Sequence, residues 1–522
     1  MKGKVVKICS LIFAGMLAVG CMAACGDRGT TGAQENVLTI RYFTGGTGSV
    51  WLENAAEKFE ASHEGVTVKL EGDSGVTSLM QTQLTSGKDL ADIYMTNEFA
   101  WQEQVSMGRL ADLTDVYEAE VQTKDGPVKI KDYMLDEVAE SRYLSRYEGS
   151  PSVPWTMLMG FSQAGLVYNE EMLLSTPHTT AKAGEWDVGD LWTAPPETVA
   201  DLVAYCNDLN AREDEILEMT GNTEFDPLTF SGNEPVWLQR LMYGWWGQYQ
   251  GAEELNTANA DVAEQGGGTF FDFWNYGSAD VFNQAGIEAA VGAFQDVFVD
   301  LNTHQYKNVP LASTSYSTYD AERRFTQQQT AMVVGGAFIY NEMTGVRDAD
   351  GDGEDDFTMK MMMLPAVEGA QVGDDGELLK MNLYNCEDVV LIPSQATNVE
   401  LAKEFLILLC EEESLLDYTK LTSELRPFKY DPMDAETEDF EYGPFALSVI
   451  ENFNACDVHL VRCPVGTEME ERTLISLYSQ PIWDTAYTSF TASLLTQDAG
   501  TIAENIYSGA QKEWPKWEAQ VR

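Results

Sequence analysis

The chain has 522 residues, which is enough for two or three domains, and its hydrophobic share of 44% excludes a disordered protein. Asp and Glu number 84 against 32 Lys and Arg, which gives a formal net charge of −52. Because proteins bind phosphate backbones through Lys and Arg, this balance excludes nucleic acid as a partner.

The first 24 residues have the order of features found in a secretory signal peptide. Lys2, Lys4 and Lys7 give a positive start, and a largely apolar run over residues 8–24 follows. This run is short for a membrane span, and no apolar run elsewhere in the chain approaches 18 residues. We therefore expect residues 1–24 to be a signal peptide and the body of the protein to lie outside the membrane.

The residues after this run favour attachment to a lipid. The segment MAACG, which ends at Gly26, resembles a bacterial lipobox, in which the cysteine is lipidated after cleavage; here that cysteine is Cys25. The small and polar residues 25–36 are typical of a tether. We expect an extracytoplasmic protein anchored to the bacterial cell membrane through Cys25; the alternative is an ordinary secreted protein with an incidental cysteine.

Residues 37–95 predict alternating strands and helices. The apolar, β-branched run 37–43 predicts a strand, and a glycine-rich turn separates it from a helical pattern that begins near Leu52. A second strand (66–70), a second helix and a third short strand (92–95) follow. This βαβαβ order indicates a parallel sheet covered by helices, as in α/β proteins.

The rest of the chain predicts further helices and strands in an α/β arrangement. Helices are expected at 198–209, 234–250, 284–301, 399–410, 482–495 and 499–517, and strands at 331–334, 361–364 and 388–392. Asn398 stands where a side chain could cap the helix at 399–410. Cys456 and Cys463 either pair across a short loop or remain buried thiols.

Two local patterns resemble catalytic motifs and fail on inspection. The turn Gly45-Gly46-Thr47-Gly48 lacks the lysine of a phosphate-binding P-loop and the third glycine of a dinucleotide-binding loop. It is better interpreted as a tight turn that lines a cleft. The segment Gly72-Asp73-Ser74-Gly75 resembles a serine-protease nucleophile motif, but Val76 follows it and no histidine is placed to complete a triad.

An acidic loop is the sharpest local pattern in the chain. Its carboxylates fall at positions 1, 3, 5, 7 and 9 of a calcium-binding loop, with Gly353 at position 6. Met359 stands at position 12, where a calcium loop has its bidentate glutamate, so we expect at most a weak structural calcium site. The alternative is a solvated acidic loop. The candidate ligands are Asp348, Asp350, Asp352, Glu354 and Asp356.

Aromatic residues form 11% of the chain, and one cluster lies beside hydrogen-bonding side chains. Glu234 and its neighbour Asn233 precede Trp237 at the start of an aromatic-rich helix, whose rings can equally well belong to the core. Sugars present apolar C–H faces that pack on rings, and hydroxyl groups that pair with carboxylates and amides. The pattern is therefore typical of a carbohydrate-binding site.

Residues 37–522 resemble the extracellular solute-binding proteins of carbohydrate ABC transporters, a class related to maltose-binding protein. The resemblance rests on five segments in the family's order: LTIRYF with WLENAAEKFEASHEGVTVKL, SGKDLADIYMTNEF with SMGRLADLTDVY, SVPW with GLVYNEEML, TQQQTAMVVGGAFI, and IPSQATNVELAKEFLILLCEEE. The chain departs from the family pattern at Ala91, where proline is usual, and at Ala337, where a sugar-stacking tryptophan is usual and Phe338 follows.

This resemblance implies two α/β lobes joined by crossing strands, with a ligand cleft between them that closes by hinge rotation. It places the N-terminal lobe at 37–154 plus 366–412 and the C-terminal lobe at 155–365 plus 413–522. Transferred segment by segment, the ligand-binding residues are Thr44, Thr47, Asn97, Glu98, Trp155, Glu234, Trp237, Phe338 and Trp483.

The implied function is a substrate-binding lipoprotein that captures a sugar or oligosaccharide and delivers it to a membrane permease. It implies a monomer without catalytic residues or a required cofactor. Two alternatives stay open from the residues themselves. A binding protein for a peptide or polyamine would use clustered carboxylates, and a secreted glycoside hydrolase would need two carboxylates at catalytic separation.

Overall fold

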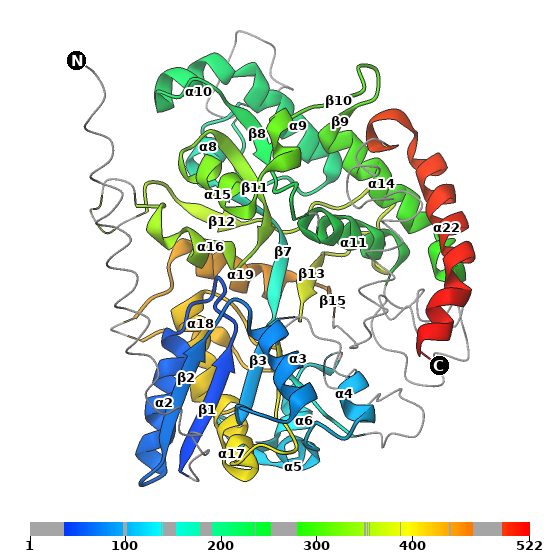
Figure 1. Cartoon of the computed structure of the whole chain (residues 1–522). Coiled ribbons are helices and arrows are strands. Elements are labelled where there is room, and N and C mark those ends of the chain that lie inside the picture. Colours follow the sequence, from blue (N-terminus) through cyan, green and yellow to red (C-terminus); the bar gives the residue numbers. More distant parts are fainter. Residues whose placement is uncertain are drawn as a thin grey trace, which may run out of the picture.

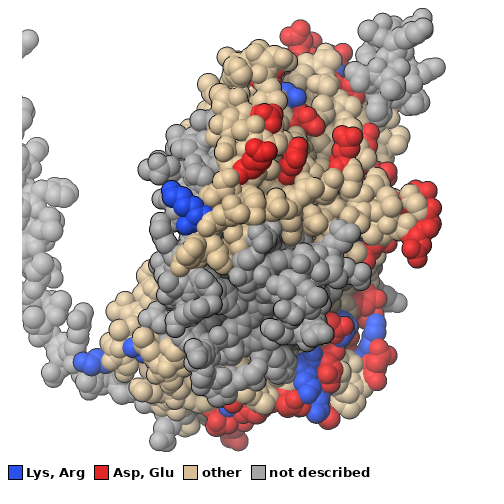
Figure 2. All heavy atoms as spheres, turned by 90° about the vertical axis from the view of Figure 1, so that its right-hand side faces the viewer, with Lys and Arg blue, Asp and Glu red and all other residues tan. Residues whose placement is uncertain are grey.

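The computed structural model shows two α/β lobes, one above the other in Figure 1. It describes residues 36–97, 102–136, 138, 153–177, 191–234, 236–251, 279–348, 351, 353, 355–386, 388–437, 440–462 and 493–521. Within these ranges, no helix is both long and apolar enough to cross a membrane. Figure 2 shows acidic side chains spread over the upper lobe, as the net charge requires.

The first lobe is built on a five-stranded sheet with the order β2-β1-β3-β14-β6. Its first three strands are parallel to one another, whereas β14 runs antiparallel to both β3 and β6. The βαβαβ prediction for the start of the chain is therefore confirmed. The strands are β1 (Val37–Tyr42), β2 (Thr67–Gly72), β3 (Ile93–Asn97), β6 (Met157–Leu158) and β14 (Asp388–Leu391).

Helices cover this sheet through one apolar face each. In α2 the buried residues include Leu52, Ala55 and Phe59, which recur at helical spacing and contact the core below β1. The other elements are α3 (Val76–Ser86), α4 (Gln102–Ser106), α5 (Thr114–Glu118), the hairpin β4 (Glu120–Thr123) and β5 (Gly126–Lys129), α6 (Ile130–Tyr133), α17 (Val399–Leu409), α18 (Glu412–Thr422) and the 3-10 turn η6 (Pro432–Ala435); α2 is Val50–Ser62.

The second lobe is built on a sheet with the order β15-β13-β7-β11-β8, to which β12 adds along β7. The long strand β7 runs antiparallel to β11, β12 and β13. Every residue of β11 is buried, as expected for a central strand covered on both faces. The strands are β7 (Ser162–Asn169), β8 (Asp226–Thr229), β11 (Thr330–Gly336), β12 (Met359–Met361), β13 (Met381–Asn385) and β15 (Val458–Arg462).

Helices and short turns surround the second sheet. The C-terminal helix α22 packs along α14, which packs on α11 (Figure 1). The elements are α8 (Glu170–Leu174), α9 (Val199–Ala211), α10 (Glu213–Thr220), α11 (Val236–Gln250), η3 (Ala279–Phe282), α14 (Ala285–Phe298), the hairpin β9 (Val299–Asp300) and β10 (Gln305–Tyr306), η4 (Leu311–Ser315), α15 (Thr318–Thr326), α16 (Ile339–Glu342), η5 (Met343–Gly345), α19 (Pro444–Ala455) and α22 (Ala499–Val521).

Two of the connections between the lobes lie side by side, and a third leads from η6 in the first lobe to α19 in the second. The chain leaves the first sheet after β6 and enters β7 at Ser162, and it returns from β13 at Asn385 to β14 at Asp388. The two connections are paired, because Ser162 lies opposite Asn385 and the Met159 N–H donates to the Asp388 carbonyl oxygen. This paired double crossing forms the hinge region between the lobes.

The positions of these connections differ from the expected lobe boundaries at three segments. Residues 157–158 form β6 in the first sheet, residues 381–385 form β13 in the second sheet, and α18 packs against α2 in the first lobe. None of these three elements was among those expected from the sequence, and the sheet that an element joins depends on its pairing with distant segments. There are two smaller differences. Strand β12 covers residues 359–361, whereas a strand was expected at 361–364. The side chain of Asn398 does not cap α17 but donates hydrogen bonds to the Val37 carbonyl oxygen and the Asp92 carboxylate.

Candidate ligand-binding site

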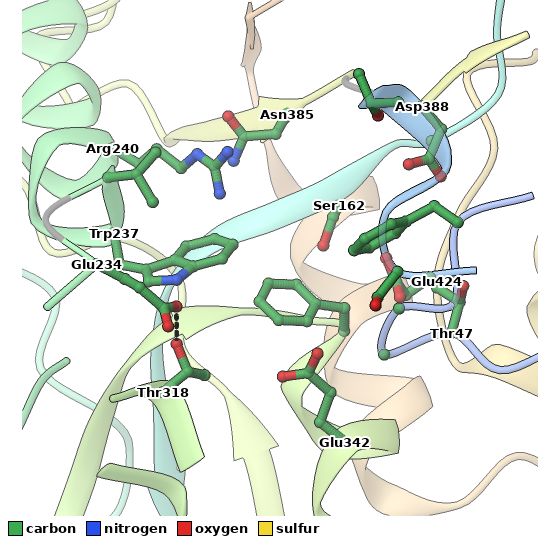
Figure 3. Close-up of a pocket in the computed structure, with 18 of the residues that line it drawn as sticks. Thr47, Ser162, Glu234, Trp237, Arg240, Thr318, Glu342, Asn385, Asp388 and Glu424 are labelled. Atoms are coloured by element: carbon green, nitrogen blue, oxygen red, sulfur yellow. Dashed lines mark hydrogen bonds between the residues drawn. The ribbon is translucent and has the colours of Figure 1, made fainter. Parts of the chain in front are cut away.

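A cavity of about 760 Å³ lies between the lobes, next to the double crossing (Figure 3). The first lobe contributes the turn after β1 and the first turn of α3, and the second lobe contributes the starts of α11 and α15 and the segment that includes α16. The crossing segments form its floor. The lining residues are Phe43, Gly45, Gly46, Thr47, Ser74, Gly75, Thr77, Ser78, Gly160, Ser162, Glu234, Val236, Trp237, Arg240, Thr318, Phe338, Glu342, Asn385, Asp388 and Glu424.

An aromatic wall faces the cavity from the second lobe. The rings of Trp237 and Phe338 lie with their centroids 4.6 Å apart, and the guanidinium carbon of Arg240 lies 4.1 Å from the Trp237 ring centroid. Arg240 is one helical turn beyond Trp237 on α11, so the helix itself sets this stacking. The wall combines flat apolar surface with a cationic hydrogen-bond donor.

Carboxyl groups flank this wall on the same lobe. Glu234 accepts a hydrogen bond from the Thr318 hydroxyl, which a capping box at Ser317 places at the start of α15. Glu342 ends α16 and reaches across to the glycine turn of the first lobe, where a Cβ on Gly46 would lie 2.6 Å from its Cγ. Glycine at position 46 therefore allows the two lobes to approach closely.

The floor of the cavity contains polar side-chain atoms that form no hydrogen bond with any of the described residues. Asn385 is 3% exposed, and none of the described residues hydrogen-bonds to either its amide oxygen or its amide nitrogen. The Oε1 atom of Glu424, also 3% exposed, likewise has no partner among the described residues. Because buried polar groups are costly when unpaired, a ligand that hydrogen-bonds to them is expected.

Arg426 supports this floor from behind. Its guanidinium donates to the Met159 carbonyl oxygen in the crossing, and its carbon lies 3.5 Å from the ring centroid of Tyr418 and 4.6 Å from that of Trp51. Its positive charge favours the ionised forms of Asp388 and Glu424. Burial outweighs this attraction and raises the pKa of both carboxyls, that of Glu424 to about 8.

The raised pKa of Glu424 predicts a pH dependence of stability in the ligand-free protein. An unfolded glutamate has a pKa near 4.3, so between about pH 4 and pH 8 the folded state binds more protons at this site. The free energy of unfolding therefore decreases as pH rises through this window. We expect the thermal midpoint to fall by several degrees from pH 5 to pH 8, and Glu424→Gln to reduce that fall. An equal fall in the variant would contradict this account.

The structure brings four of the residues expected from the sequence into the cavity: Thr47, Glu234, Trp237 and Phe338. Three others do not line it. Thr44 packs its methyl group beside Gly72, Asn97 lies opposite Asp388 in the sheet, and Trp155 packs on the first-lobe core. Glu98 and Trp483 lie outside the described residues, as do Cys25 and Cys463.

Several floor and wall residues escape prediction from the sequence. Ser162, Asn385, Asp388 and Glu424 are single residues at strand ends or in a connection, without a local motif. Arg240 lies within the aromatic helix that was identified, but its spacing from Trp237 is the only signal that it joins the site. The usable hint was the strand expected at 388–392, because ligands in α/β proteins bind near strand ends.

The acidic loop is only partly described. Asp348 accepts backbone hydrogen bonds from Gly351 and Gly353, whereas Asp350, Asp352 and Glu354 lie outside the described residues. Asp356 is described, and its N–H donates to the Arg347 carbonyl oxygen. Within the described part of the chain, no group of three or more His, Cys, Asp or Glu side chains is arranged to hold a metal ion.

Comparison with known proteins finds one matching family model and solved structures with a similar fold. The family model described as "Bacterial extracellular solute-binding protein" matches residues 54–438. A probable secreted solute-binding lipoprotein from Streptomyces coelicolor has a similar structure, with a TM-score of 0.54, 14% sequence identity, and coverage of 92% of this chain and 99% of that one. No curated protein sequence matches the chain.

Two further solved structures share the fold. RafE from Streptococcus pneumoniae matches with a TM-score of 0.55 and 14% identity over 92% of this chain and 99% of its own, and RafE has also been solved in complex with raffinose. A substrate-binding protein from Listeria monocytogenes in complex with cycloalternan matches with a TM-score of 0.53 and 15% identity over 92% and 99% of the two chains. Both likenesses extend over both lobes.

Proposed function

Since the chain belongs to the bacterial extracellular solute-binding family, we propose that it captures a sugar or oligosaccharide outside the cytoplasm and delivers it to the permease of an ABC importer. The protein acts as a monomer attached to the membrane through lipidated Cys25. It binds its ligand without changing it.

One observation carries the choice of a sugar. The interlobe cavity sets the aromatic wall of Trp237 and Phe338 opposite a floor where Asn385 and Glu424 keep hydrogen-bonding atoms open. A sugar satisfies both surfaces at once, because its C–H face packs on rings and its hydroxyl groups pair with amide and carboxyl oxygens. The structures of RafE with raffinose and of the Listeria monocytogenes protein with cycloalternan support the same class.

A ligand panel tests this function directly. The mature protein is titrated by calorimetry and by tryptophan fluorescence against neutral mono- and oligosaccharides, a short peptide and spermidine. We expect micromolar binding of at least one sugar, which corresponds to about −8 kcal/mol. Binding of the peptide or spermidine alone would favour a non-sugar solute. Cleavage products detected by chromatography after incubation with oligosaccharides would favour a glycoside hydrolase.

The open amide of Asn385 gives a prediction in which stability and affinity change in opposite directions. In Asn385→Leu, an apolar side chain of similar size replaces a buried amide that lacks protein partners. We expect the free energy of unfolding of the ligand-free protein to stay the same or to rise by up to roughly 1 kcal/mol, so that its thermal midpoint does not fall. Sugar affinity should fall at least about tenfold. Scanning calorimetry and titration check the two effects, and a loss of stability would contradict the floor as described.

The acidic loop carries a second proposal, a weak structural calcium site. The loop does not line the cleft, so calcium binding can be tested independently of sugar binding. We expect millimolar Ca²⁺ to raise the thermal midpoint and a chelator to reverse the rise, since a site of this kind binds at about 10⁻⁴–10⁻³ M. Asp348→Asn should abolish the shift. An unchanged midpoint with Ca²⁺ would identify the segment as a solvated loop.

A further inference from the structure

The charged side chains that line the cavity are mostly acidic. Glu234, Glu342, Asp388 and Glu424 carry carboxyl groups, and Arg240 carries the one guanidinium among the residues that line it. Arg426, behind the floor, balances part of the charge of Asp388 and Glu424. A neutral sugar needs hydrogen-bond partners, but it does not need this excess of negative charge.

The excess is greatest on the wall formed by the second lobe. Burial raises the pKa of Glu322 and of Glu342, and the nearby charge of Glu234 raises both further. Glu322 also hydrogen-bonds to Glu342, which lowers the pKa of Glu342 and raises that of Glu322. Among the described residues, no Lys, Arg or His forms an ion pair with any of the three glutamates. The Thr318 hydroxyl, which donates to Glu234, is neutral.

Two of these carboxyl groups face a common space from different parts of the chain. Glu342 projects from α16, and Glu424 projects from the connection that follows α18 (Figure 3). Their proximity is enough for the charge of Glu342 to raise the pKa of Glu424. Glu424 is 97% buried, lines the cavity, and has an Oε1 atom without a partner among the described residues.

Resting on the sugar-binding function proposed above, we propose that the ligand is an amino sugar whose ammonium group lies between Glu342 and Glu424. An ammonium group donates three hydrogen bonds, so it can satisfy the open oxygen of Glu424 and still reach Glu342. The nearby rings of Trp237 and Phe338 suit the apolar face of the sugar and also favour a cation. A metal ion is a poorer occupant, because no group of described side chains is arranged as a metal site.

The binding step has a consequence for protons. In the ligand-free protein Glu424 holds a proton at neutral pH, since its pKa is about 8 beside Asp388, Glu342, Arg426 and the Ser162 hydroxyl. An ammonium group favours the ionised carboxylate. An amino sugar that is already protonated in solution therefore releases the Glu424 proton to the solvent when it binds, whereas a neutral amine would take that proton up and release none. A neutral sugar does not favour ionisation, and its binding should release none.

The test uses three oligosaccharide series with one skeleton. Cello-, chitin and chitosan oligosaccharides of two to four residues share β-1,4 linkages and differ at carbon 2, which bears a hydroxyl, an acetamido or an ammonium group. Titration calorimetry of the mature protein at about pH 5.5, where both the ligand amine and Glu424 are protonated before binding, in buffers of different ionisation enthalpy, gives affinity and proton release together. Glucose with glucosamine, and galactose with galactosamine, extend the comparison to single residues.

We expect an amine-bearing member to bind at least about tenfold more tightly than its hydroxyl counterpart, with close to one proton released. Glu342→Gln and Glu424→Gln should each remove most of this preference. Glu400→Gln, which makes the same substitution at an exposed position on α17 away from the cavity, should leave it intact. Thermal midpoints of all three variants confirm that they are folded.

The outcomes separate this inference from the function on which it rests. Equal or tighter binding of the neutral sugars, or a preference for amines that both glutamine variants retain, would overturn the ammonium site and leave a neutral-sugar receptor. Binding of spermidine without any sugar would overturn both. Binding of neutral sugars outside the three series, with no amine-bearing sugar bound, would also overturn the ammonium site.

Discussion

Trp237→Ala is expected to weaken sugar binding on the order of 100-fold, the largest loss of affinity for any single change in the cleft. The indole lines the cavity and is the surface on which both Phe338 and Arg240 lie. Removing it takes away the apolar face for the sugar, and it also leaves the 4%-exposed Arg240 guanidinium without the ring that positions it. Titration calorimetry against the sugar identified in the panel measures the loss.

Two matched variants distinguish a binding anchor from a general packing residue. Trp237→Phe keeps a ring at the position and should recover a substantial part of the affinity. Tyr319→Ala removes an aromatic side chain that is 60% exposed next to Thr318 but does not line the cavity, so its affinity should match that of the wild type. Unchanged affinity in Trp237→Ala, with a normal thermal midpoint, would exclude the tryptophan as an anchor.

The parts of the fold that depend on local pattern could be predicted from the sequence. The alternation of apolar strands and amphipathic helices at the start of the chain predicts the parallel half of the first sheet, which the structure confirms. Helices α9, α11, α14 and α17 begin within two residues of their expected starts. In each case the buried face repeats at the period of the element, so short stretches of sequence contain the information.

Lobe membership was less accessible, because it depends on pairing between distant segments. Strand β13 was not among the strands expected from the sequence, and its pairing with β7 and β15 places it in the second lobe. Helix α18 has one buried face, and the sequence does not say that α2 covers it. Contacts between segments distant in the sequence decide the lobe to which β13 and α18 belong, and the periodicity of apolar residues contains no information on such contacts.

The site shows the same division. Thr47, Glu234 and Trp237 lie next to motifs that the sequence displays, a glycine turn and an aromatic helix, and all three line the cavity. Ala337, where the family has a tryptophan, leaves open a platform that is smaller, shifted or absent, and in the structure Phe338 lines the cavity beside Trp237. The floor could not be foreseen, since Asn385 and Glu424 meet only after both lobes are assembled.

Arg426→Ala is expected to give the largest loss of stability, about 3–5 kcal/mol in the free energy of unfolding. The guanidinium is 3% exposed and serves three surfaces at once: the Met159 carbonyl in the crossing, the rings of Tyr418 and Trp51, and the carboxyl groups of Asp388 and Glu424. Its removal leaves two buried acids without their counter-charge. Urea denaturation followed by tryptophan fluorescence measures the loss.

The charge and the shape of Arg426 can be separated. Arg426→Lys keeps the positive charge but not the planar group that stacks on the rings, so we expect an intermediate loss. Adding Glu424→Gln to Arg426→Ala should restore part of the stability at pH 9, because Glu424, with a pKa of about 8, is ionised there and the glutamine is neutral. The loss in Arg426→Ala should also shrink from pH 9 to pH 5, because Glu424, with a pKa of about 8, is protonated at pH 5 and needs no counter-charge, and burial shifts the pKa of Asp388 in the same direction. A loss that is independent of pH and of Glu424 would mean that Arg426 stabilises the hinge by packing alone. It would also mean that its positive charge does not stabilise the carboxylates of Asp388 and Glu424.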